Sequence, residues 1–235
     1  METRLRLDMQ SQPDDTTCGP TCLQAIYRYY GDEIRLDQVI SEHVSLREGG
    51  TFAVFLACHA LRRGYKATLY TYNLEVFDPS WFVPERQDLE TKLTTQLEYK
   101  KESRLIKATQ GYLEFLRLGG TLKYEDLTGS LIRKYLRRGI PILTGLSSTY
   151  LYQEPRETGV ENGHDDLRGR PAGHFVVLCG YHKEERQVAI ADPFLHNPLA
   201  KGRNIYDVGI DRVLCAILLG IVTHDANLLI IEPRK

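Results

Sequence analysis

No stretch of the 235-residue sequence is apolar for long enough to cross a membrane. The longest apolar run, Val213 to Val222, is about half the roughly 20 residues that a spanning helix needs, and we expect it to be buried in the core. The first fifteen residues contain no apolar segment of the kind found in secretory signals. We therefore expect a cytoplasmic protein with no membrane partner.

The sequence also lacks an excess of charge of either sign. It contains 30 Lys and Arg residues against 31 Asp and Glu residues, which gives a formal net charge of −1. Proteins that bind nucleic acids usually carry a strongly basic face, so we predict no nucleic-acid partner. The sequence specifies no oligomeric state.

Cysteine is scarce and irregularly spaced. The five cysteines form no CxxC pair, and their odd number without a secretory signal argues against a disulfide framework. Cys18 and Cys22 have no matching Cys/His pair elsewhere, so we predict no zinc site and no other metal or organic cofactor. We expect most of the cysteines to be small buried hydrophobic residues.

The patterns of apolar residues predict an α+β fold. Helices are predicted from helical periodicity at 22–31, at 36–43, after Gly49-Gly50 with Thr51 as N-cap, at 127–138, and as one or two amphipathic helices within 85–118. Short alternating or apolar runs predict strands at 66–74, 140–148, 174–182, 187–193 and 227–233. The polar turn after residue 182 indicates that the third and fourth of these strands form a hairpin.

The length suits one domain with an elaboration. We predict a single domain over residues 1–235, with residues 85–125 as a helical insertion within it. Residues 153–170 are polar and without periodicity, which predicts a loop. One interpretation is that this loop lies beside the functional site, as loops often do.

Cys18 is a candidate nucleophile. It stands where a turn meets a predicted helix, and the partial positive charge of a helix N-terminus favours a thiolate. Gly19 permits close approach of a substrate or of another backbone segment, and Pro20 suits the first helical turn. The alternative is a buried structural cysteine near a helix start.

His174 and Asp192 are candidate partners of that thiol. His174 opens one strand of the predicted hairpin and Asp192 ends the other, so the carboxylate can lie beside the imidazole and orient it. Taken singly, each has a structural alternative: a hydrogen-bonded histidine at a strand end, and a capping aspartate before Pro193. The chain order of thiol, histidine and aspartate is that of papain-like enzymes.

Three segments carry a more specific resemblance. They are QPDDTTCGPTCLQAIYRYYG from Gln12, GGTFAVFLACHALRRGY from Gly49, and AGHFVVLCGY from Ala172 followed by IADP. In this order they resemble the bacterial double-glycine leader peptidases, papain-like domains often fused to peptide exporters. The resemblance covers roughly residues 8–75 and 140–195.

The resemblance implies a papain-like fold, with Cys18 on an N-terminal helical half and with His174 and Asp192 on a C-terminal antiparallel sheet. It also implies that Gln12, six residues before Cys18, donates to the oxyanion of the tetrahedral intermediate. No phosphate-binding GxxxxGK[ST] motif is present, so we expect a stand-alone enzyme rather than one fused to a transporter.

The implied activity is a thiol hydrolase that cleaves a peptide or a small amide. Two alternatives remain at this level: an acyl transferase that uses the same triad, and a papain-like binding module without catalysis. Other polar residues fit simpler roles. We expect Asp14 and Asp15 to shape the turn before Cys18, His164 to lie in a solvated loop rather than a metal site, and His196 to have a small chance of touching substrate.

Overall fold

The computed structural model describes residues 2–46, 49–83, 88–158, 163–200, 202–223 and 225–234. Residues 85–87 of the predicted insertion and 159–162 of the predicted loop lie outside them. Within these ranges no helix is both long and apolar enough to cross a membrane.

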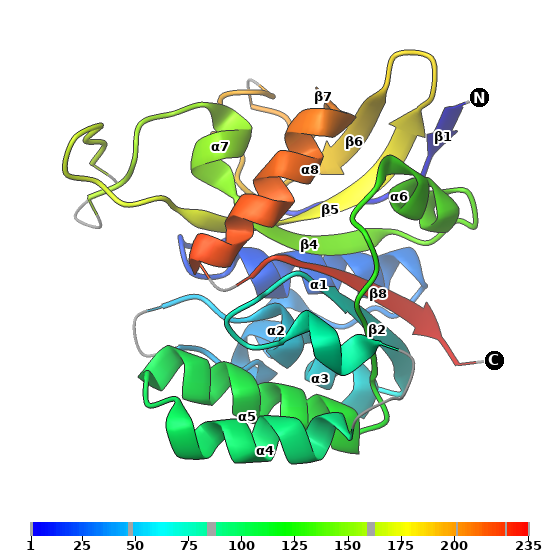
Figure 1. The fold of residues 1–235 in the computed structure, drawn as a ribbon. Helices are drawn as coiled ribbons and strands as arrows, with labels where there is room; N and C mark the ends of the chain where they lie inside the picture. The colour runs from blue at the N-terminus through cyan, green and yellow to red at the C-terminus, as the bar shows by residue number, and fades with distance from the viewer. Residues whose placement is uncertain are drawn as a thin grey trace.

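The described residues form α-helices, strands and two 3-10 helices (Figure 1). The helices are α1 (Cys18–Tyr29), α2 (Leu36–Glu42), α3 (Ala53–Arg62), α4 (Leu89–Tyr99), α5 (Ser103–Arg117), α6 (Gly129–Leu136), α7 (Ser148–Tyr152), α8 (Ile210–Leu219), η1 (Pro79–Phe82) and η2 (Gly220–Thr223). The strands are β1 (Glu2–Arg4), β2 (Tyr65–Thr71), β3 (Thr121–Lys123), β4 (Ile142–Ser147), β5 (Gly173–His182), β6 (Gln187–Ala191), β7 (Ile205–Gly209) and β8 (Asn227–Pro233).

The strands build one sheet in the order β3-β2-β8-β4-β5-β6-β7, and β1 pairs separately with β5. Every pairing is antiparallel except that of β2 with β3. The predicted hairpin is present as β5 and β6, and the predicted C-terminal strand is β8, in the middle of the sheet. Helices combined with a mainly antiparallel sheet confirm the predicted α+β class.

The sheet is buried on both faces, and β5 shows how. Its residues Phe175, Val177 and Cys179 join the apolar cluster formed with α1, α3 and α5, whereas Val176 and Leu178 join the cluster formed with α6 and α8. Successive side chains of a strand point to opposite faces, so one strand serves both cores. Figure 1 shows α1 to α5 on one side of the sheet and α6 to α8 on the other.

The segment predicted as one or two amphipathic helices forms two, α4 and α5. Helix α5 packs tightly on α3, because a Cβ atom at Gly111 would lie 2.7 Å from a ring carbon of Phe55. The interpretation of residues 85–125 as an insertion within a single domain stays a prediction.

The predicted N-cap of α3 is wrong. Helix α3 begins at Ala53, and the hydroxyl of Thr51 instead donates to the carbonyl of Val44. Asp225 takes the capping role, because its Oδ1 accepts from the Ala53 amide at 2.9 Å. Burial raises the pKa of this carboxyl to about 7, although the Ala53 amide and the charge of Arg104 act to lower it.

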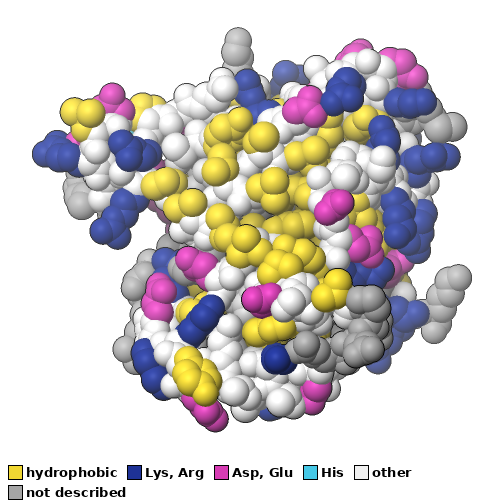
Figure 2. Space-filling model, in the orientation of Figure 1, with side chains coloured by type: hydrophobic (Ala, Val, Ile, Leu, Met, Phe, Trp, Pro, Cys, Tyr) yellow, Lys and Arg dark blue, Asp and Glu magenta, His cyan; other side chains and the backbone are white. Residues whose placement is uncertain are grey.

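The expectation for residues 213–222 is only partly correct. They fall mainly on α8, where Val213, Ala216 and Ile217 are buried, but Leu218 and Leu219 are exposed. In Figure 2 hydrophobic side chains gather on the face where α8 lies. A continuous apolar run does not distinguish a buried strand from a helix that buries one face.

Candidate active site

Cys18 is the first residue of α1, and the turn before it is held by Asp14. The carboxylate of Asp14 accepts hydrogen bonds from the amide and the hydroxyl of Thr16 at 2.8 and 2.7 Å, as expected for a turn-shaping residue. Gly19 permits a close approach, because a Cβ atom there would lie 2.8 Å from Cγ2 of Thr51. The Cys18 thiol thus lies at a helix N-terminus, where the helix dipole favours negative charge.

The β5–β6 hairpin brings His174 and Asp192 together. Val177 pairs with Ala191, so His174 near the start of β5 and Asp192 after the end of β6 lie at the same edge of the hairpin. Nε2 of His174 is 2.8 Å from Oδ1 of Asp192. The other ring nitrogen, Nδ1, is therefore the one left to face Cys18, which lies close enough to contribute to the raised pKa of His174.

The electrostatics of this pair favour charge on both partners. Burial by itself lowers the pKa of His174, but the charge and hydrogen bond of Asp192 and the contact with Cys18 outweigh it and raise the pKa to about 10. Burial likewise acts to raise the pKa of Asp192, yet His174, Tyr206 and Tyr152 together lower it. The two groups form a buried ion pair at neutral pH.

Two tyrosines complete the surroundings of Asp192, whose side chain is fully buried. The hydroxyls of Tyr152 and Tyr206 donate to its Oδ2 at 2.7 and 2.6 Å, and the amide of Phe194 donates to Oδ1 at 2.9 Å. Burial and the neighbouring carboxylate raise the pKa of both phenols, which therefore stay protonated donors. A buried carboxylate is tolerated because its lone pairs are satisfied.

Removing one of these donors should destabilise the fold. We expect Tyr206→Phe to lower the free energy of unfolding by about 2 kcal/mol, because a hydrogen bond to a buried charge is lost. Urea denaturation measures the change. Tyr72→Phe is the matched control: the Tyr72 hydroxyl is buried and has no hydrogen-bond partner within the described ranges, so its loss should cost nothing. Equal effects of both changes would contradict the role of Tyr206.

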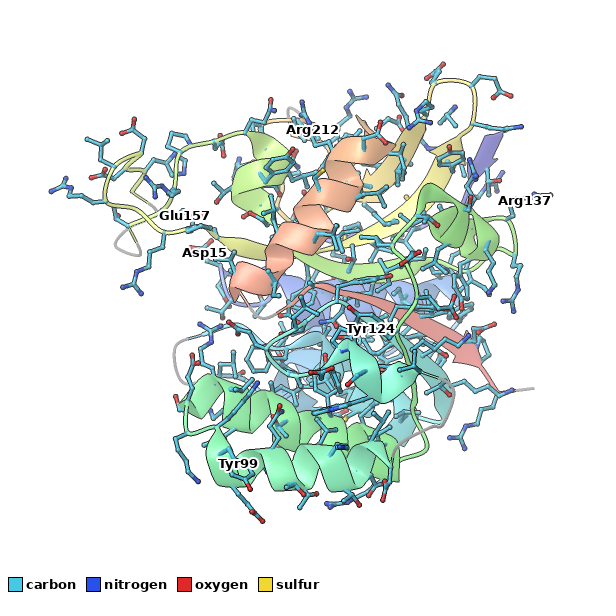
Figure 3. The ribbon with its side chains drawn as sticks, in the orientation of Figure 1. Asp15, Tyr99, Tyr124, Arg137, Glu157 and Arg212 are labelled. Atoms are coloured by element: carbon cyan, nitrogen blue, oxygen red, sulfur yellow. The ribbon has the colours of Figure 1, made fainter. Side chains whose placement is uncertain are left out.

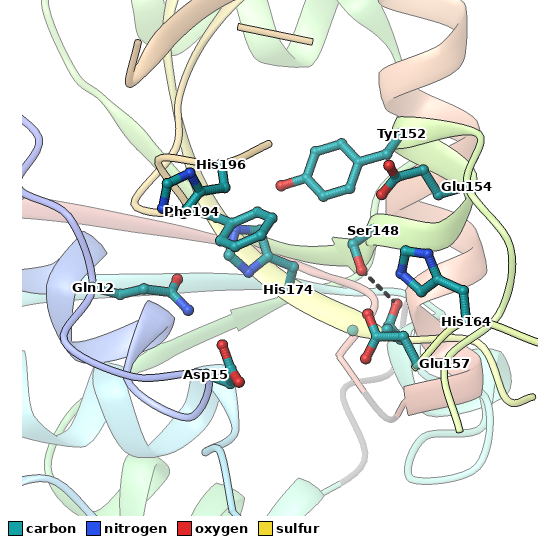
Figure 4. Close-up of a pocket in the computed structure, with 12 residues that line it drawn as sticks. Gln12, Asp15, Ser148, Tyr152, Glu154, Glu157, His164, His174, Phe194 and His196 are labelled. Carbon is teal, nitrogen blue, oxygen red and sulfur yellow. Dashed lines mark hydrogen bonds between the residues drawn. The ribbon is translucent and has the colours of Figure 1, made fainter. Parts of the chain in front are cut away.

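Gln12 lies on the segment before the Cys18 turn and is attached to the Asp192 side of the site. The backbone N–H of Gln12 donates to the carbonyl of Pro193 at 2.9 Å. Its side-chain Nε2 donates to the carbonyl of Asp14 at 3.0 Å, which employs one of the two Nε2 hydrogens. Figure 4 shows the Gln12 side chain extending toward the space beside His174.

Two cavities meet at His174. The first, which we call the thiol-side cavity, has a volume of about 280 Å³ and is lined by Cys18, Gly49, Gly50, Thr51, Arg104, His174 and Asp225, among others. The second, the histidine-side cavity, has a volume of about 290 Å³ (Figure 4). Its lining residues are Gln12, Asp15, Ser148, Tyr152, Glu154, Glu157, His164, Ala172, Gly173, His174, Phe194 and His196.

The structure brings Cys18, His174, Asp192 and Gln12, the four site residues proposed from the sequence, into one region. Sequence reasoning missed Tyr152, Tyr206 and Phe194, which no local motif marks. His164 and His196 both line the histidine-side cavity, and so do Glu154 and Glu157 of the loop predicted beside the site. Within the described ranges, no three His, Cys, Asp or Glu side chains form a group that could hold a metal ion.

Comparison with solved structures identifies the fold. A C39-like peptidase from Bacillus anthracis is 14% identical, with a TM-score of 0.56 over 100% of this chain and 99% of that chain. A double glycine motif protease from an AMS/PCAT transporter, solved with its leader peptide, is 14% identical, with a TM-score of 0.47 over 99% and 95%. Xylellain, a cysteine protease from Xylella fastidiosa, is 14% identical, with a TM-score of 0.44 over 100% and 86%.

The similarity to the Bacillus protein confirms the predicted papain-like fold. No curated protein sequence matches the chain. The model of the Peptidase_C39 like family matches residues 4–207, which is most of the sequence and includes Gln12, Cys18, His174 and Asp192. The chain belongs to the Peptidase_C39 like family and is a cysteine peptidase.

Proposed function

We propose that this peptidase uses Cys18 as nucleophile, His174 as acid and base, and Asp192 as the residue that positions the imidazole. The observation that carries the proposal is the 2.8 Å hydrogen bond between His174 and the buried Asp192, beside a thiol at a helix N-terminus. A thiolate next to an imidazolium is the arrangement that activates a cysteine for acyl transfer. Membership of a peptidase family supports water, rather than an amine, as the acyl acceptor.

The geometry supports a two-step reaction. Sγ of Cys18 attacks the substrate carbonyl, the C–N bond breaks, and His174 Nδ1 gives its proton to the leaving amine. Water then attacks the thioester, His174 accepts a proton from that water, and the carboxylic acid leaves as the thiol is regenerated. Asp192 keeps Nε2 protonated throughout, so Nδ1 is the atom that exchanges protons.

Gln12 is proposed as the side-chain donor to the oxyanion. One Nε2 hydrogen is held by the Asp14 carbonyl, and this contact orients the amide while leaving the second hydrogen for the developing negative charge. The hydrogen bond from the Gln12 amide to Pro193 ties this donor to the segment that carries Asp192. The backbone amide at Cys18 is the second proposed donor.

The thiol-side cavity supports a substrate with small residues before the bond that is cut. A Cβ atom at Gly49 would lie 2.8 Å from Cγ2 of Thr16, and one at Gly173 would lie 2.6 Å from Oγ1 of Thr223, so these two glycines of the lining pack directly against neighbouring side chains. Arg104, at the start of α5, also lines this cavity. This supports the proposal that residues 85–125 are an insertion in a single domain that shapes the substrate cleft.

A peptide library tests the proposed function. Wild-type protein should cleave a subset of its members, and mass spectrometry of the products identifies the bonds that are cut. If wild-type protein reacts with a thiol electrophile at Cys18 but cuts no peptide, the proposed nucleophile would stand and the proposed peptide substrate would be contradicted.

Asp192 offers a test that separates positioning from folding. We expect Asp192→Ala to lower kcat/KM by about 10³-fold, because the imidazole loses the acceptor that orients it. Asp192→Asn keeps an oxygen for Nε2 but removes the charge that raises the pKa of His174. We therefore expect a smaller loss for Asn, together with a pH–rate profile whose alkaline limb moves to lower pH. An unmoved profile in an equally stable Asn variant would contradict the electrostatic role.

A further inference from the structure

The two cavities divide the proposed reaction between them. Cys18 lines only the thiol-side cavity, whereas His174 lines both. On the proposed function, the acyl group bound to Sγ therefore occupies the thiol-side cavity. The amine that receives its proton from His174 then leaves through the histidine-side cavity, so this second cavity faces the leaving segment of the substrate.

The histidine-side cavity is acidic. Three of its lining residues are carboxylates, Asp15, Glu154 and Glu157, and none of its lining residues in the described ranges is Lys or Arg. Asp15 and Glu157 come from distant parts of the chain and lie at the same edge of the molecule (Figure 3). The wall that faces the leaving amine therefore carries negative charge from two segments.

The positions of the two glutamates are set by the backbone. Glu157 exchanges two backbone hydrogen bonds with Arg170, at 3.0 and 2.8 Å. Glu154 follows α7 directly after Gln153, whose φ of 59° turns the chain at the helix end. Figure 4 shows both side chains on the side of the cavity opposite Gln12.

Two arginines of the same loop, Arg156 and Arg168, are engaged elsewhere. Arg156 donates to the carbonyls of Asp166 and Leu167, and Arg168 pairs with the carboxylate of Asp165 at 2.7 Å. These contacts turn the arginine charges toward the loop itself. Among the described residues neither Glu154 nor Glu157 forms an ion pair, with Arg170 or with any other cation, so both carboxylates are available to a charge that enters the cavity.

The other wall of the cavity is aromatic. The ring centroid of Phe194 lies 6.4 Å from that of His174 and 6.3 Å from that of His196. The ring centroid of Tyr152 also lies 6.4 Å from that of Phe194. An apolar wall next to the reacting histidine suits the aliphatic part of a side chain, and carboxylates beyond it suit a cationic end. Lys and Arg combine these two features.

We propose that the histidine-side cavity selects substrates in which a Lys or Arg residue follows the bond that is cut. The cation pairs with Glu154 and Glu157 while the main-chain nitrogen of the same residue receives the proton from His174 Nδ1. The reaction is otherwise unchanged: the C–N bond breaks, the C–S bond forms, and no electrons are exchanged with any other group.

Acyl-group partition measures this preference without knowledge of the natural peptide. The 4-nitrophenyl ester of benzyloxycarbonyl-Gly-Gly acylates the thiol and releases 4-nitrophenol, and the acyl-enzyme then reacts with water or with an added amine. By microscopic reversibility, an attacking amine occupies the cavity that a leaving amine vacates. The two amines to compare are argininamide and norleucinamide, with products counted by mass spectrometry.

We expect argininamide to capture about fivefold more acyl group than norleucinamide, the effect that two partly exposed ion pairs supply. The double variant with Glu154→Gln and Glu157→Gln should reduce the ratio to about one, and 0.5 M NaCl should reduce the wild-type ratio because exposed charges are screened. The control Glu98→Gln, at an exposed residue of α4, removes one carboxylate charge away from the cleft and should keep the wild-type ratio.

Equal capture of the two amines by the wild type, or a ratio that persists in the double variant, would overturn the proposal while leaving the proposed function intact. A protein that releases no 4-nitrophenol above the Cys18→Ala background and gains no acyl mass would instead overturn the proposed function, and this inference with it.

Discussion

We expect the replacement of Cys18 by alanine to abolish peptide cleavage. We expect kcat/KM to fall by about 10⁵-fold or more, because Cys18 is the one thiol among the described residues that line the two cavities. The fold should be unaffected, since Cys18 is small and sits at the first position of α1, where its side chain supports no buried network beyond His174. Cleavage of a peptide found in the library, followed by mass spectrometry, measures the loss.

Cys22→Ala is the matched control for this change. Cys22 lies one turn further along α1, is fully buried, and contacts the carbonyl of Phe175 through its sulfur. Burial, together with the charge of Cys18, raises the pKa of this thiol well above its ordinary value, so it stays protonated and unreactive. We expect the Cys22 variant to keep most of its activity. A loss as large as that of Cys18→Ala would contradict the assignment of the nucleophile.

Replacing His174 by glutamine has the second largest expected effect. We expect kcat/KM to fall by about 10⁴-fold, because the thiol loses its base and the leaving amine loses its acid. His182→Gln is the control: His182 ends the same strand and pairs in register with Gln187, far from the site. We expect this control to cleave at nearly the wild-type rate, and a comparable loss there would show that the histidine effect is structural.

His174→Gln should also change how the free energy of unfolding depends on pH. The pKa of His174 is raised from 6.5 to about 10, so its ion pair stabilises the fold fully below pH 6.5 and loses that effect as the pH rises toward 10. The difference in unfolding free energy between wild type and His174→Gln should therefore shrink between these two values. Chemical denaturation across that range measures it, and a difference that stays constant would contradict a charged His174.

The elements that bear the reactive groups could be predicted from sequence because their signals are local. The turn before Cys18, the apolar run that His174 opens and the turn that joins β5 to β6 each lie within a few residues of the group they position. The hairpin register places Asp192 beside His174, so predicting the hairpin was enough to predict that these two residues are close together.

The supports of the site could not be predicted in the same way. Tyr152 and Tyr206 reach Asp192 from 40 and 14 residues away, and neither stands in a motif. Asp225 caps α3 from 172 residues away, which is why Thr51 appeared to be the better cap. Strand β7, which brings Tyr206 to the site, is a five-residue alternating segment without a flanking turn signal strong enough to mark it.

The most direct test of the central claim is the rate at which each cysteine reacts with iodoacetamide near neutral pH. The five cysteines are free thiols, and Cys215 is exposed whereas Cys18 is only 8% exposed. Accessibility alone would label Cys215 first. An activated Cys18 should instead react at least about tenfold faster than Cys215, and His174→Gln should remove that advantage. Preferential labelling of Cys215 in the wild type, with Cys18 inert, would contradict the account.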